Sequence, residues 1–541
     1  MDKKLIVFLL IFFAFFAAYQ RLVLEPYSKK PAPQPVPAKP SKVQPSAQAQ
    51  PPAPVEPFPP AEIQAEAKLK TAVVETPLYR AEFSTRGAVL VSFRLNKYRD
   101  DYGRPLEMIP QPSAGVNPPI SLDFEDKNLT KLASEAIFLV DKESASVSNH
   151  QKTGLRFDFS DAKYRFSKVF EFNGDSYLIH CTTEARNGES FLPVRVVWSP
   201  GLESSAGYRN AEEMTPSRGL VNSGTEIEHV DAEKVKEFHK VGATVRWAGV
   251  ENNYFAGIFI PTNQPADAYI NQAGNSGKKV HNVAVFLAAQ KAEPLQMSLF
   301  VGPKDYVLLK QLGMDLEQVV DFGFFGPITK ALFFTLKYFV GFTKNYGWAI
   351  VLLTILIKII FTPFTQMSFA SMKKMQQMQP ELKKVQEKYG KMKNDDPRKQ
   401  SMNVEIMQLH KRYGVNPLGG CFPMLLQMPV LFAFYSLLSN SIELRRAPFV
   451  LWLQDLSRPD PYYVTPVLMG ATMLWQQRMT PSSDPMQKNM MYIMPIMFTW
   501  ISLKLQSGLV LYWLLSNVLA IAHQYYFQWQ QKPARVEGKN A

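Results

Sequence analysis

The sequence predicts an α-helical polytopic membrane protein that carries a large β-sandwich domain between its first and second membrane spans. Three observations lead to this fold class. Apolar runs gather at the extreme N-terminus and after residue 340. Between about residues 70 and 310, apolar and polar residues alternate with the period of half-buried strands. The segment 371–416 carries eleven basic and five acidic residues, a net charge of +6, as cytoplasmic loops of membrane proteins do.

The N-terminus has a basic start followed by an apolar run from Leu5 to Ala18. This pattern fits a cleaved signal peptide or a retained transmembrane anchor over residues 1–25, and the composition leaves both open. Both interpretations send the following chain out of the cytoplasm. Residues 26–65 are rich in proline, alanine and glutamine, cannot bury a core, and are predicted to act as a tether.

Residues 66–310 are predicted to form the β-sandwich, because many short alternating stretches are separated by Gly and Asn turns. The stretch YRFSKVFEFNGDSYLIHCTTEA predicts two strands around the turn Asn173-Gly174-Asp175. The tetrapeptide GNSG at Gly274–Gly277 has the spacing of a serine hydrolase elbow. Its polar, Gly-rich context lacks the strand-to-helix frame of such an elbow and favours a plain turn.

Residues 311–345 are predicted to contain an amphipathic helix at the outer membrane surface. Lys330, Lys337 and Lys344 are spaced seven apart in an otherwise apolar segment, which places the cations on one helix face.

Five apolar runs follow and, with the N-terminal run, predict six transmembrane helices. They cover residues 346–366, 421–440, 462–477, 490–504 and 508–528. The last two runs are nearly continuous, and the span 490–528 has 39 residues, about 58 Å as one helix, which exceeds a hydrocarbon core of about 30 Å. A tight external hairpin is therefore expected at Gln506-Ser507-Gly508.

The runs of 16 and 15 residues at 462–477 and 490–504 are short, so we expect a thinned bilayer or water beside them.

Counting the crossings from an internal N-terminus gives a consistent orientation. The segment 367–416 and the short basic tail 531–541 lie inside, and helices 3–6 occupy residues 417–530. The outer loop 441–460 has three basic and three acidic residues. The positive charge thus accumulates on the predicted cytoplasmic side, with both termini cytoplasmic.

Lys358 lies ten residues inside Trp348, about 15 Å along a helix and close to mid-membrane. An ionised lysine at that depth costs roughly 2.5 to 3.5 kcal/mol, so water or a partner is required. The alternative is that Lys358 snorkels along its own helix toward the cytoplasmic interface near Gln366. Thr354 and Thr362, one turn to either side, make a polar strip that favours a wet cavity.

The five later apolar runs contain no acidic residue to pair with Lys358. The neutral candidates on other helices are Gln427, Ser436, Thr472, Thr499, Ser516 and Asn517. A cation without a fixed counter-ion predicts a site for a transient anionic or polar guest. Lys504 stands at the outer end of its run and is expected to snorkel.

Two amphipathic stripes predict an antiparallel helical hairpin on the cytoplasmic side. The first comprises Met372, Met375, Met378, Leu382, Val385 and Tyr389, and the second Met402, Ile406, Leu409 and Tyr413. The main role of the stripes is to pack together. The methionines also suit varied apolar partners, and the surrounding lysines suit anionic lipid or ribosomal RNA.

Other function classes find little support in the sequence. Cys181 and Cys421 do not make a disulfide framework, and seven scattered histidines make no metal site. GNSGKK lacks the spacing of a phosphate-binding loop, so no nucleotide or other cofactor is predicted. A secondary transporter with Lys358 as its anion site requires two similar halves, which are absent. An intramembrane Ser/Lys hydrolase or a sugar-processing sandwich lacks its catalytic constellation, so we expect no enzyme.

The segment GVNPLGGCFPMLLQMPVLFAFYSLL, residues 414–438, closely resembles the signature of the YidC membrane protein insertases, the YidC/Oxa/Alb family. SGLVLYWLLSN, residues 507–517, resembles their last span, and the segment 320–364 is similar to their passage from an interfacial helix into the second span. The resemblance implies the Gram-negative type in the bacterial inner membrane. It has a retained N-terminal anchor, a periplasmic β-sandwich and an insertase core of five helices.

The resemblance also implies a function and a site. Lys358 would take the place of the cation in the family's hydrophilic, cytoplasm-open groove, and Tyr512 and Trp513 would keep an aromatic contact with the guest segment. Thr354, Thr362 and Gln427 are added to this groove from their helix positions and polar side chains. Most relatives have arginine there; lysine keeps the charge and loses the bidentate fork. The implied activity is the insertion and folding of nascent membrane proteins without covalent chemistry, alone or with the Sec translocon. Anionic lipids and a weak ribosome contact through the basic loop complete the expected partners, with no DNA.

Overall fold

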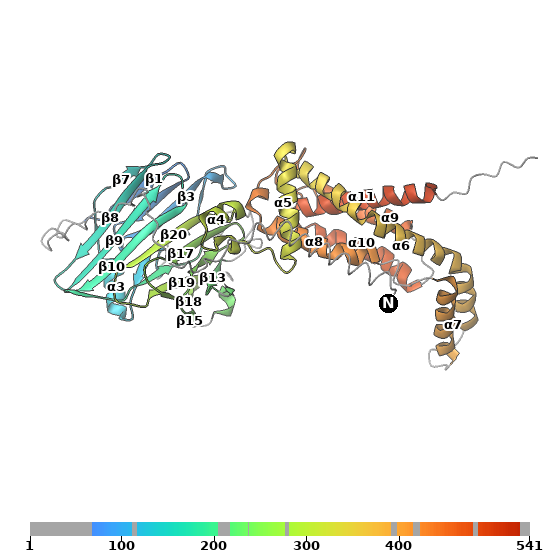
Figure 1. The fold of residues 1–541 in the computed structure, drawn as a ribbon, viewed down its shortest axis with the longest axis horizontal. Coiled ribbons are helices and arrows are strands. Elements are labelled where there is room, and N and C mark those ends of the chain that lie inside the picture. Colours follow the sequence, from blue (N-terminus) through green and yellow to red (C-terminus); the bar gives the residue numbers. More distant parts are fainter. Residues whose placement is uncertain are drawn as a thin grey trace, which may run out of the picture. The chain divides into compact units, whose positions relative to one another are not determined.

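The computed structural model describes residues 68–110, 116–203, 217–224, 226–235, 237–275, 281–390, 398–414, 422–479 and 485–530 (Figure 1). The predicted anchor and linker, residues 1–65, and the tail 531–541 lie outside the described residues. So do residues 276–280, which hold part of the GNSG stretch. The described chain comprises β-sheets up to residue 303 and helices after it.

The strands of the described residues form three sheets. The first has the order β4-β3-β2-β1-β7 and comprises β1 (Thr71–Glu75), β2 (Tyr79–Ser84), β3 (Val89–Arg99), β4 (Pro105–Glu107) and β7 (Ser144–Ser146). The largest has the order β14-β13-β16-β17-β20-β10-β9-β8-β6, with β11 paired to β10. Its strands are β6 (Leu139–Val140), β8 (Lys152–Ser160), β9 (Tyr164–Asn173), β10 (Leu178–Asn187), β11 (Ser190–Phe191), β13 (Arg218–Asn222), β14 (Ile227–Asp231), β16 (Trp247–Glu251), β17 (Phe255–Pro261) and β20 (Leu295–Pro303).

The third sheet has the order β15-β18-β19-β12-β5. It comprises β5 (Ser121–Asp123), β12 (Arg195–Trp198), β15 (His239–Gly242), β18 (Ala266–Asn275) and β19 (His281–Ala289). Two short helical segments accompany the sheets, α3 (Lys127–Glu135) and η4 (Ala232–Lys234). Nearly all the pairings are antiparallel; β1 and β7 run parallel.

The β9–β10 hairpin shows how the local sequence sets the register. Ile179 pairs with Phe172 and Asn187 with Tyr164 across the hairpin. At the turn, the side-chain oxygen of Asn173 accepts a hydrogen bond from the backbone N–H of Asp175 at 3.1 Å, an Asx turn. The predicted hairpin around Asn173-Gly174-Asp175 is therefore confirmed.

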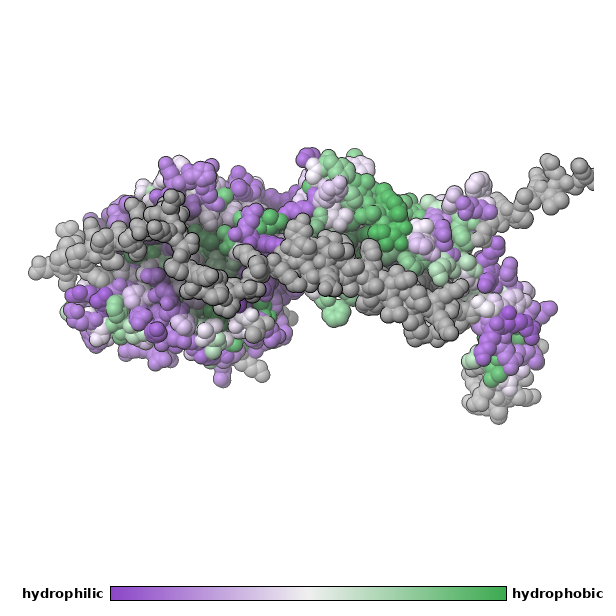
Figure 2. Space-filling model, viewed as in Figure 1, coloured by the Kyte–Doolittle hydropathy of each residue, from purple (hydrophilic) through white to green (hydrophobic). Residues whose placement is uncertain are grey.

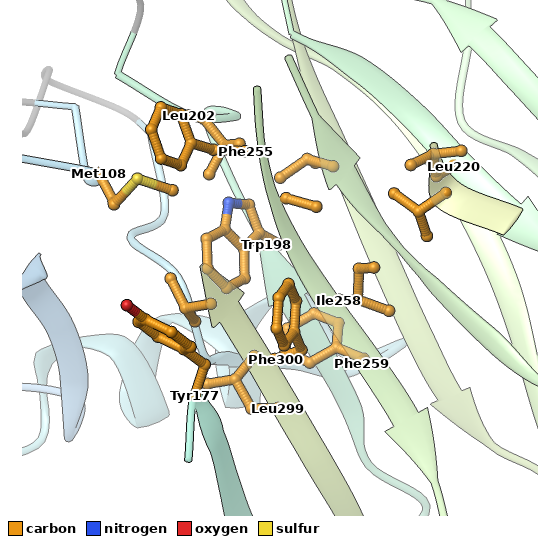
Figure 3. Packing of buried hydrophobic residues seen from close by; sticks show 14 of the residues in the cluster. Met108, Tyr177, Trp198, Leu202, Leu220, Phe255, Ile258, Phe259, Leu299 and Phe300 are labelled. Carbon is orange, nitrogen blue, oxygen red and sulfur yellow. The ribbon is translucent and has the colours of Figure 1, made fainter. Parts of the chain in front are cut away.

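The core between the sheets is built on large aromatic side chains. Trp198 of β12 is fully buried among other large apolar side chains (Figure 3). Its indole N–H donates to the carbonyl of Gly201 at 2.9 Å. Its ring lies edge-on to Phe259, with centroids 5.9 Å apart. A Cβ at Gly257 would stand 2.5 Å from the Trp198 ring, so only glycine lets β17 approach this closely.

The chain leaves the sheets at Pro303 and becomes helical in α4 (Tyr306–Leu312), η5 (Leu316–Val319) and α5 (Gly326–Thr343). Asp305 caps α4 by accepting hydrogen bonds from Val307 and Leu308. On α5, Lys330 lies over the rings of Tyr306 and Phe322, and Lys337 pairs with Glu443 at 3.2 Å. Two of the three lysines predicted on this helix face therefore contact other parts of the protein. The most exposed large side chains of α5 are the aromatic Tyr338 and Phe342.

α6 (Tyr346–Gly390) is one helix of 45 residues that runs through the predicted second span and into the predicted hairpin. It contains Pro363 and Pro380. α7 (Arg398–Tyr413) returns along its last turns, with contacts between Met378, Leu382 and Leu409 at their centre. The side chain of Met372 lies outside the described side chains.

Four more helices complete the described chain: α8 (Phe422–Asn440), α9 (Val464–Arg478), α10 (Pro485–Ser502) and α11 (Ser507–Gln530), with the short η7 (Ile442–Leu444) after α8. The final two apolar runs are two separate helices. The break lies at residues 503–506, slightly before the predicted Gln506-Ser507-Gly508, and α11 already begins at Ser507. By length and composition, the described residues contain one helix able to cross a membrane, Tyr346–Tyr389, and the shorter apolar helix Tyr492–Ser502. Figure 2 shows hydrophobic residues gathered over part of the helical region and hydrophilic residues over the sheets and α7.

Candidate functional site

Three helices meet at a chain of polar side chains that begins at Lys358. The ammonium group of Lys358 on α6 donates to Oε1 of Gln427 on α8 at 3.2 Å. The amide nitrogen of Gln427 donates to the hydroxyl of Tyr512 on α11 at 3.3 Å. We refer to Lys358, Gln427 and Tyr512 as the Lys358 cluster. Lys358 therefore points toward another helix, and its bond to Gln427 is unlike a snorkelling side chain that follows its own helix.

Tyr512 is the rigid member of the cluster. It is fully buried, and its ring stacks on Phe434 of α8 with centroids 4.5 Å apart and an angle of 13°. An offset aromatic stack of this kind fixes the ring plane. The hydroxyl that receives the Gln427 amide is thus held between α8 and α11.

Thr354 and Thr362 share the Lys358 face of α6, but their hydroxyls bond within the helix. Thr354 donates to the carbonyl of Ile350 at 2.7 Å, and Thr362 donates to the carbonyl of Lys358 at 2.8 Å. Bonds from Thr to the carbonyl four residues earlier are a common use of the hydroxyl in apolar helices. The threonines keep the strip polar, while contact with the lysine side chain comes from Gln427.

Trp513 lies apart from the cluster. Its ring packs edge-on against Phe498 of α10 with centroids 5.0 Å apart. Successive residues of a helix point about 100° apart, so Tyr512 and Trp513 face different neighbours. The structure brings together Lys358, Gln427 and Tyr512 of the predicted site residues, and places Trp513 against α10.

Four of the other five neutral candidates from the sequence belong to different contacts, whereas Ser516 is buried one turn after Tyr512 on α11. Asn517 of α11 donates to Thr472 of α9 at 3.4 Å, and Thr499 donates to the carbonyl of Pro495 at 2.7 Å. Ser436 accepts a 3.5 Å bond from Asn440. The Asn517–Thr472 bond joins two helices, the other two bonds lie within single helices, and none of the three involves Lys358.

Sequence reasoning missed Gln524, whose amide donates to the carbonyl of Met479 at 3.2 Å and ties the ends of α9 and α11. The signal was available, because Gln524 follows Asn517 by seven residues, two turns along the same face.

Charge at the cluster is not balanced by an acid in the described residues. No acidic side chain of the described chain forms a salt bridge with Lys358, and the ammonium group retains donors beyond the one that Gln427 accepts. The described residues also hold no group of three or more His, Cys, Asp or Glu side chains suited to a metal ion.

The hairpin of α6 and α7 presents a separate feature. Met375 and Met378 lie in its apolar contact with Leu382 and Leu409. At the rim, Lys388 pairs with Glu405 at 3.2 Å, and the Tyr413 hydroxyl donates to Glu381 at 2.7 Å. The two stripes therefore pack against each other and leave most lysines at the surface.

The sequence and the structure of this chain are similar to those of known proteins. A family model described as 60Kd inner membrane protein matches residues 338–534, and one described as YidC periplasmic domain matches residues 71–335. The chain is 36% identical to the membrane protein insertase YidC of Citrifermentans bemidjiense, over 85% of this chain and 86% of that protein. It is also 36% identical to the YidC of Syntrophus aciditrophicus, over 98% of this chain and 100% of that protein.

Two solved structures also match the chain at low similarity. A crystal structure of an active YidC insertase with its first transmembrane domain resolved is 18% identical, with a TM-score of 0.37, over 86% of this chain and 96% of that chain. A galactose mutarotase related enzyme from Lactobacillus acidophilus is 10% identical, with a TM-score of 0.30, over 43% of this chain and 97% of that chain. The matches to both family models and to relatives over nearly the full length show that the chain belongs to the YidC family.

Proposed function

We propose that this protein is a membrane protein insertase that receives its substrates at the Lys358 cluster. The relatives of similar length carry the name membrane protein insertase. The observation that supports the site is the bond from Lys358 to Gln427 across two helices, with no acidic partner for the lysine among the described residues.

The charge of Lys358 provides the attraction. An ammonium group has three donors, and Gln427 accepts one of them. The remaining donors suit the carboxylates and carbonyls of a polar tail that must cross the hydrocarbon region. Because lysine is a point charge without the arginine fork, the attraction is transient and releases the tail on the far side.

One short helix contributes a thinner barrier, whereas α10, which holds the second run predicted to be short, has 18 residues. α9 has 15 residues, about 22 Å of helix, against a hydrocarbon core of about 30 Å. A bilayer that adapts to this length shortens the path of a polar segment through hydrocarbon. The free energy of the step comes from the substrate's own apolar helix as it enters lipid, with no nucleotide required.

The proposed topology has six spans, the first in residues 1–25 and five that build the insertase core. The β-sandwich is periplasmic, both termini are cytoplasmic, and the protein resides in the bacterial inner membrane. Nascent membrane proteins are the substrates, alone or with the Sec translocon. The lysines of the α6–α7 hairpin suit anionic lipid headgroups and a weak ribosome contact. The activity is that of a chaperone and insertase without covalent catalysis.

Complementation of a depleted bacterial strain tests this function. Insertion of a short single-span substrate with an acidic outer tail is followed with wild type, Lys358→Arg and Lys358→Ala. We expect arginine to support insertion and alanine to block it. Normal insertion with alanine would remove the charge-attraction step. A role of Lys358 as a small-anion site predicts instead that insertion survives while anion uptake is lost.

A further inference from the structure

A second level of contact between α6 and α11 lies about three turns beyond the Lys358 cluster. His523 follows Tyr512 by eleven residues on α11, and Phe369 follows Lys358 by eleven residues on α6. Eleven residues complete about three helical turns, so each pair shares a helix face and is separated by roughly 16 Å along the axis. The rings of Phe369 and His523 lie against each other with centroids 5.4 Å apart.

The surroundings of His523 are aromatic. Phe527, one turn further on α11, also packs on Phe369 with centroids 5.6 Å apart. Within the part of the chain that the structure describes, Nε2 of His523 is buried and has no hydrogen-bond partner. A buried ring nitrogen without a partner costs roughly 1 to 3 kcal/mol. Leucine or phenylalanine would fill this place without that cost.

A neighbouring helix repeats the pattern. On α9, Oε1 of Gln477 is likewise buried and unpartnered among the described residues. The bond from Gln524 to Met479 places the end of α9 beside the His523 turn of α11. Polar groups that the fold leaves unpaired are thus found at the C-terminal ends of two helices.

We propose that His523 is a substrate-contacting residue, which donates a hydrogen bond to carboxylates or carbonyls of the incoming polar tail before the tail reaches Lys358. The inference rests on the proposed function, since it assigns His523 to the path by which a substrate enters. In the proposed topology the level of His523 is the cytoplasmic end of that path. Phe369 and Phe527 close the level when no substrate is present, and their flat rings part without breaking a polar contact.

Site-specific photo-crosslinking tests the contact directly. Benzoylphenylalanine is placed at position 523 of the full-length protein and, as a matched control, at exposed Ala522 on the adjacent face of α11. A ribosome-stalled substrate with an acidic tail is then irradiated. We expect a crosslink from position 523 and little from position 522. Absence of a crosslink at 523, or equal crosslinking at both positions, overturns the proposal.

Substitutions test the hydrogen bond. His523→Phe keeps the ring packing and removes both nitrogens, whereas His523→Gln keeps a donor. We expect His523→Phe to slow insertion of the acidic-tailed substrate roughly five-fold, the worth of one hydrogen bond, and His523→Gln to restore most of the rate. Gln528→Ala, at an exposed position of the same helix, serves as the control at wild-type rate.

The outcomes separate this inference from the function on which it rests. If His523→Phe inserts normally while Lys358→Ala fails, His523 is a packing residue and the Lys358 step stands. If the Lys358→Ala variant inserts the substrate at the normal rate, attraction of the substrate by Lys358 is excluded. The crosslink at position 523 then still decides whether His523 contacts the substrate. Equal protein levels of all variants, measured in the membrane fraction, exclude a folding defect as the cause.

Discussion

Asp101, in the hairpin between β3 and β4, accepts a hydrogen bond from Arg458 at 2.7 Å and a second from Arg446 at 2.9 Å. Both arginines belong to the segment between α8 and α9, and the adjacent Arg445 donates to the carbonyl of Arg99 at 3.1 Å. One carboxylate thus links the sandwich to the helical part of the chain. It does so through charge-assisted bonds, which are stronger than neutral ones.

Asp101→Ala is expected to loosen this link. The pairs are partly exposed, so we expect a modest loss of about 1 kcal/mol, reduced further in high salt. Hydrogen exchange of residues 96–104 in the full-length protein should accelerate several-fold. Glu135→Ala, at an exposed position of α3, provides the control without a change. Unaltered exchange in the Asp101 variant would show that the hairpin is held by other contacts.

Glu251 stabilises the sandwich through interactions that are lost in acid. It is fully buried and accepts hydrogen bonds from Lys304 at 2.6 Å, Arg218 at 2.8 Å and His229 at 3.0 Å. Burial alone would raise the pKa of Glu251, but the charge of Lys304, the His229 bond and the charge of Arg218 together lower the pKa from 4.5 to about 2. The native carboxylate therefore binds its proton less tightly than the unfolded one.

The stabilisation by Glu251 is complete above pH 4.5 and is lost as the pH falls from there toward 2, because the unfolded chain then binds more protons. The shift corresponds to at most about 3 kcal/mol. Urea unfolding followed by tryptophan fluorescence at several pH values should show this slope. Glu251→Gln should flatten it and should destabilise the protein at pH 7. A wild-type slope in that variant would assign the acid sensitivity elsewhere.

Lys168 is a fully buried cation in the sandwich. Its ammonium group donates to the carbonyls of Gly87 at 2.8 Å, Ala88 at 3.0 Å and Ile120 at 2.7 Å. Lys168→Met leaves three carbonyls unpaired, so we expect a loss of about 3 kcal/mol. Thermal unfolding of the full-length protein measures it, with exposed Lys163→Met as the control. A melting temperature equal to that of the control contradicts this role.

Gln427→Leu tests the cluster from its middle residue. The substitution removes the acceptor that holds the Lys358 ammonium group and the donor to Tyr512. We expect insertion of an acidic-tailed substrate to slow roughly five-fold, as for one lost positioning bond, with a smaller effect than Lys358→Ala. Ser436→Ala on the same helix is the control. A defect as large in the control would point to α8 packing as the cause.

Met378 and Met407 offer a matched pair on the α6–α7 hairpin. Met378 is fully buried, whereas Met407 on α7 is 61% exposed. An aspartate in place of Met378 carries an unpaired charge into the apolar contact, at a cost of several kcal/mol. Met378→Asp should therefore separate α7 from α6, which would be measured as rapid hydrogen exchange of residues 398–413. Met407→Asp should leave this exchange slow. Slow exchange in both variants would show that the stripe contact is dispensable.

The sequence predicted elements whose signals are local. Asn173-Gly174-Asp175 specified a hairpin because the Asx turn and the alternating strands around it need no distant contact. The separation of α10 from α11 followed from length alone. Spacing of seven placed Lys330 and Lys337 on one face, but their partners Tyr306 and Glu443 come from other elements and could not be read from periodicity.

At the site, the sequence identified the lysine and only part of its environment. Thr354 and Thr362 were assigned to the site because they share a helix face with Lys358. A threonine hydroxyl can instead donate to a backbone carbonyl of its own helix, and both of these hydroxyls do so. Gln427 was one of six neutral candidates, and which of them meets Lys358 depends on how α6 and α8 pack. His523 drew no notice because a single histidine near a helix end carries no pattern by itself.

The unbroken course of α6 has a mechanical consequence. Lys358 and Met378 are twenty residues apart in one helix, about 30 Å. Pro363 lies between these two residues. Pro363 and Pro380 each remove a backbone donor, and bending is easiest there. Movement of the hairpin is therefore taken up mainly at Pro363, and Lys358 can keep its bond to Gln427 while the hairpin changes direction.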